Sequence, residues 1–270
     1  MLSHARYQFS FLLATAKLGF ATYLAYPAGV AMVFVSYPIV ILMYRYVFSA
    51  VYAHGNEIAG YDLAAILTYV TVSWILNTFY MTPTGRTLGQ RVRDGQVAMD
   101  LIKPVNLMAI YFGQSLGRTA FRAIFATLPL LFLFIFLADL LPPPRANILP
   151  FALAVVCGYL INFQLDYMIG MVAFYFGYNN GIRWGIRMVM GIVGGLVIPL
   201  NFFPATLAKV FSFFPTQYMF FQPLQIYLGR VQAEEAWLVV GNGLAWVAGL
   251  LILAQLMQAD GTRRLSLSGG

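Results

Sequence analysis

Residues 63–85 read LAAILTYVTVSWILNTFYMTPTG, and residues 86–106, which follow, read RTLGQRVRDGQVAMDLIKPVN. The first stretch has no charged residue and is long enough to cross a bilayer core of roughly 30 Å, which takes about 20 helical residues. The second concentrates charge in a chain that otherwise avoids it. Only 9% of the 270 residues are charged, whereas soluble domains carry about 25%. The pair of stretches therefore predicts a membrane span followed by a water-exposed loop.

Five further stretches have the apolar character of membrane spans: 23–48, 119–138, 146–182, 188–208 and 236–259. The stretch 119–138 qualifies if Arg122 extends to the headgroups, and 146–182 contains one charge, Asp166. The sequence thus predicts an all-α integral membrane protein with six transmembrane helices, forming a single domain over 1–270.

Two segments are apolar but do not fit a simple span. The segment 205–229 contains Pro215 and Pro223, which would free backbone carbonyls that lipid cannot satisfy. We therefore expect external re-entrant helices there, between spans five and six. Residues 6–22 place apolar side chains at helical spacing with polar residues between them, which predicts an interfacial helix. The alternative is that they extend the first span.

The basic residues fix the predicted topology. With six spans and a cytoplasmic N-terminus, twelve of the sixteen lysines and arginines fall on the cytoplasmic side. This distribution explains the net charge of +7 without nucleic acid. We expect both termini in the cytoplasm and the loop 86–106 on the same side. Basic loops satisfy the positive-inside rule whether or not a partner binds, so docking of a soluble protein on this loop stays open from composition alone.

The loop resembles a known family. Residues 93–104, RDGQVAMDLIKP, resemble the cytoplasmic loop of permeases in the type-two ABC exporter family, which show Ile-Arg-x-Gly-x-Leu-Asp and then Leu-Leu-(Lys/Arg)-Pro. Ala98 departs from that pattern, which often has an acid there. A second resemblance covers GLVIPLNFFP at 195–204 and PTQYMFFQPLQIYLG at 215–229, which are similar to the end of the family's fifth span and to its external helices.

The resemblance implies a function and a set of partners. It implies a permease that dimerises with an identical or sister subunit, docks on cytoplasmic ABC ATPase subunits and exports an amphipathic or hydrophobic cargo across a bacterial plasma (inner) membrane. ATP and Mg would bind to the partner ATPase, with no cofactor on this chain. The coupling residues would be Arg91, Arg93, Asp94, Gly95, Asp100, Lys103 and Pro104.

Other chemistry has little support in the sequence. No lysine follows a glycine, which excludes a P-loop, and His4 and His54 fall on opposite sides of the predicted membrane, so we expect no metal site. The single cysteine, Cys157, excludes an internal disulfide, and its apolar neighbours predict a buried, inert thiol. We expect no enzymatic activity on this chain.

Two groups inside the predicted membrane are candidates for the translocation path. Tyr159, Asn162 and Asp166 share one helical face and either line the path or make interhelical hydrogen bonds. Phe202, Phe203 and Phe214 form either an external gate or part of an aromatic belt. Alternative functions are an ion-coupled secondary transporter, which needs titratable groups near the midplane, and a non-transporting membrane scaffold.

Overall fold

The structure is a computed structural model and describes residues 2–25, 28–55, 57–137, 140–177 and 180–268. Every regular element in this part of the chain is helical, which confirms the predicted all-α class. The α-helices are α1 Leu2–Leu24, α2 Ala28–Val51, α3 Leu63–Tyr80, α4 Thr84–Arg93, α5 Val97–Leu101, α6 Leu107–Arg122, α7 Leu128–Leu137, α8 Ile148–Met171, α9 Ala173–Phe176, α10 Asn180–Val193, α11 Ala205–Phe211, α12 Phe221–Tyr227 and α13 Ala233–Ser268. A π-helical turn, Ala123–Thr127, joins α6 to α7, and 3₁₀ turns lie at Tyr52–His54, Arg145–Asn147, Leu200–Phe202 and Pro215–Tyr218.

Five helical stretches of the described chain are long and apolar enough to cross a membrane: Ala31–Val51, Leu63–Arg93, Leu107–Leu137, Arg145–Phe176 and Ala233–Arg264. They correspond to five of the six predicted spans. Residues 26–27, 138 and 178–179 of the predicted spans lie outside the described part. Large apolar side chains remain exposed along these helices, for example Leu42, Phe132 and Leu253. Such a surface suits lipid and would be unfavourable in water.

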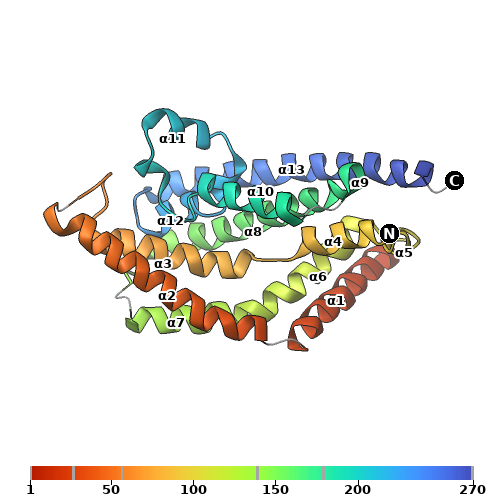
Figure 1. Cartoon of the computed structure of the whole chain (residues 1–270), viewed down its shortest axis with the longest axis horizontal. Coiled ribbons are helices and arrows are strands. Elements are labelled where there is room, and N and C mark those ends of the chain that lie inside the picture. Colours follow the sequence, from red (N-terminus) through yellow and green to blue (C-terminus); the bar gives the residue numbers. More distant parts are fainter. Residues whose placement is uncertain (1, 26–27, 56, 138–139, 178–179, 269–270) are drawn as a thin grey trace.

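The helices form an elongated bundle (Figure 1) in which α8 packs against α3, α4 and α13. The start of α1 lies beside α4 and α5, and the end of α13 points beyond them at the same end of the bundle, whereas α11 and the connection between α2 and α3 lie toward the other end (Figure 1). The bundle therefore places the charged loop and both chain ends together.

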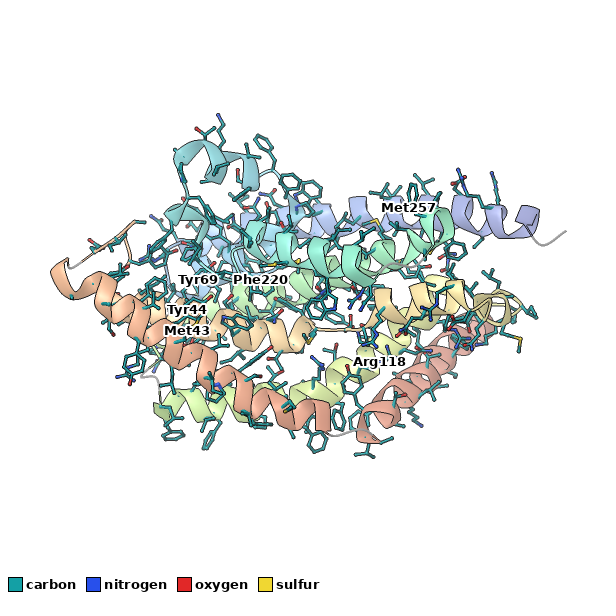
Figure 2. The ribbon with its side chains drawn as sticks, in the orientation of Figure 1. Met43, Tyr44, Tyr69, Arg118, Phe220 and Met257 are labelled. Atoms are coloured by element: carbon teal, nitrogen blue, oxygen red, sulfur yellow. The ribbon has the colours of Figure 1, made fainter. Side chains whose placement is uncertain are left out.

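The predicted continuous span 188–208 is wrong, because α10 ends at Val193 and the chain turns through Gly194 and Gly195. Gly195 has a φ of +83°, a left-handed conformation that glycine adopts readily. The carbonyls freed by this turn are satisfied from α3. Tyr69, which is fully buried (Figure 2), donates its hydroxyl to the Gly195 carbonyl at 2.6 Å, and Ser73 donates to the next carbonyl at 2.9 Å. A helix break among apolar helices is stable only with such partners.

The third long helix begins twelve residues earlier than predicted, at Leu107 instead of 119. The side chain of Arg122 in this helix does not reach the surface. Arg122 is only 9% exposed, donates to the Thr78 carbonyl at 3.4 Å and stacks over the Tyr23 ring at 5.2 Å. The expectation that Arg122 extends outward to the headgroups is therefore wrong. Helices α1 and α3 cover the Arg122 side chain.

Helix α1 is separate from α2 and packs along α6 (Figure 1). Glycines permit the close contact, since a Cβ built on Gly117 would lie 1.8 Å from the Ala16 carbonyl oxygen, and one on Gly19 would lie 2.2 Å from that of Gln114. The alternative that residues 6–22 extend the first span is thus wrong. A position at the membrane interface stays a prediction.

Segment 205–229 contains short helices only: α11, a 3₁₀ turn and α12. Each is far shorter than the roughly 20 residues that a span requires. The segment therefore does not form a continuous span. Entry of these helices into the membrane stays a prediction.

Candidate functional site

The loop at 86–106 is largely helical. Helix α4 begins at Thr84, within the predicted span, after a non-helical break at Met81–Pro83. It ends at Arg93, and Gly95, with a φ of +71°, allows the chain to reverse into α5. The predicted coupling segment is therefore a compact helix–turn–helix unit at the end of the bundle that holds both termini (Figure 1).

Asp100 is the centre of this unit. Its carboxylate is only 4% exposed and forms ion pairs with Arg91 and Lys103, each at 2.8 Å. It also accepts a hydrogen bond from the Tyr111 hydroxyl of α6 at 3.2 Å. Removing one partner of such a buried charge pair is costly. Asp100 thus fixes α4, α5 and α6 to one another, a positioning role that spacing alone did not reveal.

The outer surface of the unit is partly apolar. Met99 is 67% exposed and Ile102 is 79% exposed, whereas Val97 is fully buried. The exposed pair Arg93–Asp94, 2.9 Å apart, lies nearby in the chain. Lys103 and Pro104 are also exposed. Apolar anchors flanked by charges are typical of docking surfaces. The sequence pointed to Ile102 but not to Met99.

The predicted polar face of α8 is buried and makes interhelical hydrogen bonds. Tyr159 shares a hydrogen bond of 2.8 Å with Ser115 of α6, and Asn162 donates to the Tyr80 carbonyl at 2.7 Å. Asp166 accepts from the Gly85 amide at 2.8 Å. Asn162 and Asp166 therefore hold the last residue of α3 and the first turn of α4. Lining of the translocation path by these residues stays a prediction.

Asp166 has a basic partner, although it is the one charged residue of the predicted span 146–182. The Arg187 guanidinium of α10 lies 3.1 Å from the fully buried carboxylate. We had placed Arg187 and Arg183 in a loop between spans, but both lie within α10. The neighbouring backbones are close, since a Cβ built on Gly170 of α8 would lie 2.9 Å from Gly85. One carboxylate thus connects α4, α8 and α10.

The three predicted gate residues do not form one cluster in the described structure. Phe202 packs against Tyr61 and Phe48, with ring centroids at 5.6 and 6.4 Å. Phe203 packs against Phe211 of α11, and Phe214 is exposed. A gating role for them stays a prediction.

Metal-binding groups are sparse. No group of three or more His, Cys, Asp or Glu that could hold a metal occurs among the described residues. Cys157 is a free, buried thiol.

Comparison with known families gives one match. Residues 30–269 match the family described as ABC-2 family transporter protein. No curated protein matches the chain. The match covers nearly the whole chain, including all five membrane-crossing helices and the α4–α5 unit. The chain is therefore a multi-pass membrane permease that belongs to the ABC-2 transporter family.

Proposed function

We propose that this chain is the permease subunit of an ATP-driven exporter, works as a dimer and docks on separate cytoplasmic ATPase subunits through its α4–α5 unit. The observation that carries the proposal is the construction of that unit. It is fixed from inside by Asp100 and presents Met99 and Ile102 outward. A surface that is rigid, partly apolar and flanked by charges is suited to a protein partner.

The unit is connected to the membrane-crossing helices at both ends of α4. Asp100 joins Arg91, in the last turn of α4, to α6 through Tyr111. Asp166 joins Gly85, in the first turn, to α8 and α10. Closure of an ATPase dimer against α5 would therefore move α4 together with these helices. Rigid-body movement of packed helices is a common switching mode.

Counting α10 and the turn that follows it as a shortened fifth crossing gives six crossings. This count would keep both termini on one side of the membrane, which their position at the same end of the bundle supports (Figure 1). The same end carries Arg86, Arg91 and Arg93, so the positive-inside rule assigns it to the cytoplasm. We place the protein in a bacterial inner membrane, with ATP and Mg bound by the partner and an amphipathic or hydrophobic cargo leaving outward.

The dimer proposal rests on α10. Its 14 residues span about 21 Å at 1.5 Å per residue, less than the roughly 30 Å of a bilayer core. Its outer face is apolar and exposed, with Trp184, Met188 and Val189. A second permease covering this face would shield a helix that is too short to match the lipid by itself.

The proposal is tested by purification from native membranes in mild detergent, with co-purifying proteins identified by mass spectrometry. The variant Met99→Glu with Ile102→Glu places charge in the exposed apolar surface without touching the Asp100 contacts. Phe213→Glu, an equally exposed apolar residue of the 205–229 segment, is the matched control. We expect a P-loop ATPase with the native chain and the control, and at least a tenfold loss with the double variant.

Each outcome has a defined meaning. A second permease in the eluate identifies a heterodimer, and its absence with the ATPase retained indicates a homodimer. If no ATPase accompanies the native chain even after crosslinking, the ATP-driven proposal is wrong. Transport that stops when the ion gradient collapses while ATP is intact would instead favour the secondary transporter.

A further inference from the structure

A groove of about 490 Å³ lies between α1, α6, α8 and α13. Its floor is deep, since Phe163 and Gln164 of α8 are almost fully buried, and Leu251 of α13 lies at its exposed rim. The volume is in the lower half of the range for small-molecule sites. It suits one apolar chain with a small headgroup better than a two-chain phospholipid.

The groove is polar at one end and apolar at the other. Asn106 caps the start of α6, at the end of the bundle that carries α5, and Gln255 lies closer to that end along α13 than Val247 and Leu251 do (Figure 1). Phe112, Leu160 and Val247 are further along their helices, toward the middle of the bundle. An amphiphile in the cytoplasmic half of the bilayer has the same orientation, with its headgroup toward water and its chain toward the midplane.

Gln164 provides an acceptor in the floor. Its Nε2 donates to the Val247 carbonyl at 3.0 Å, which fixes the orientation of the amide because a carbonyl accepts only from the NH₂ group. Its Oε1 is buried and has no donor among the described residues. A buried acceptor without a partner is unfavourable, and a ligand hydroxyl or amide would satisfy it.

None of the described residues that line the groove is charged. A phosphate or carboxylate would therefore find no counterion there, and burying an unpaired charge is costly. The chemistry favours a neutral ligand.

We propose that this groove binds a neutral single-chain amphiphile that enters from the cytoplasmic half of the bilayer. Its apolar chain lies along Phe112, Leu160 and Val247, and its hydroxyl or amide donor bonds to Gln164. The binding itself does not rest on the exporter function, whereas the choice of the cytoplasmic half of the bilayer rests on the orientation proposed above.

The test uses a photoactivatable monoacylglycerol with a 14-carbon chain and a diazirine near the chain end. The full-length protein is labelled in detergent, and labelled peptides are quantified by mass spectrometry. The methyl ester of the same chain lacks the donor, and the free fatty acid carries a charge. We expect saturable labelling of α6, α8 and α13 around Phe112, Leu160 and Val247 by the monoacylglycerol, with weaker labelling by both comparison probes.

Two variants and a control locate the site. Leu251→Trp fills the rim and should reduce saturable labelling at least tenfold, whereas Leu253→Trp, an exposed leucine of α13 that does not line the groove, should not. Gln164→Leu should weaken monoacylglycerol binding about tenfold, as expected for one lost hydrogen bond, and leave the methyl ester unchanged.

Three results would overturn the assignment: equal labelling in Leu251→Trp and Leu253→Trp, labelling that does not saturate, or a fatty acid that binds as well as the monoacylglycerol. If Gln164→Leu does not fold, the comparison of the two tryptophan variants still decides.

Discussion

Neutralising Asp166 tests whether its ion pair with Arg187 holds α10 against α8. The carboxylate is fully buried, the guanidinium side chain is 17% exposed, and the two are 3.1 Å apart. Asp166→Asn keeps the size of the side chain and an oxygen that accepts from the Gly85 amide, so it removes chiefly the charge. Arg187 is then left without its counterion, and breaking a buried pair costs about 3–5 kcal/mol. Because Arg187 keeps some solvent contact, we expect about 3 kcal/mol, the lower end of that range.

Arg187→Met should cost a similar amount, because it leaves the buried carboxylate with a single backbone donor. The double variant removes both charges at once, and replacing a buried pair by neutral groups of similar volume is often close to neutral. We therefore expect the double variant to be more stable than either single variant, with a loss of about 1 kcal/mol. A double variant that is more stable than either single variant shows that the two charges interact.

The assay is the apparent Tm of the purified protein, measured by tryptophan fluorescence at one protein and detergent concentration. At about 2–4 °C per kcal/mol, each single variant should lose about 6–12 °C and the double variant about 2–4 °C. Asp260→Asn is the matched control, since its pair with Arg264 is more than half exposed and should change the apparent Tm little. A double variant that unfolds below both single variants would refute the reasoning.

Three further predictions concern the loop and the helix contacts. Asp100→Asn removes the counterion shared by two basic side chains, so amide hydrogens of 90–106 should exchange at least about tenfold faster; unchanged exchange would mean that other contacts fix the loop. Gly85→Ala puts a methyl group 2.3 Å from a carbonyl oxygen of α8 and should cost about 1–3 kcal/mol or more in thermal unfolding, whereas Gly249→Ala, in open space, should keep or raise the apparent Tm. Equal effects of the two substitutions would contradict the packing argument. Tyr69→Phe leaves a carbonyl after α10 without its donor and should cost about 1–3 kcal/mol in the same assay; an unchanged apparent Tm would show that the carbonyl finds another partner.

The long helices could be predicted because lipid imposes a simple requirement on sequence. A run such as 63–80 is long, mostly apolar and without a charged residue, so its composition alone locates it. The break after α10 could not be located this way. It is stabilised by Tyr69, which lies 126 residues from its partner Gly195, and no local pattern reports a contact at that separation.

The charged residues were predicted less well because a charge in the sequence does not reveal which way its side chain faces. Asp100 looked like part of a docking surface, but Tyr111 and two basic residues enclose it. Asp166 looked isolated because Arg187 is brought to it only by the packing of α10 on the bundle. The spacing of Tyr159, Asn162 and Asp166 did predict one shared face, and interhelical hydrogen bonds, one of the two roles left open for it, are present.

The two buried carboxylates together would let a short helix transmit the movement that we propose for it. Asp166 fixes the first turn of α4 to α8 and α10, and Asp100 fixes its last turn to α5 and α6. A helix held at only one end would bend or fray when its free end was displaced, since its 10 residues are too few to be stable without tertiary contacts. Held at both ends, α4 moves as one body with its neighbours. In the proposed docking the partner would therefore contact Met99 and Ile102, whereas the buried Asp100 and Asp166 would carry the movement from α4 into the bundle.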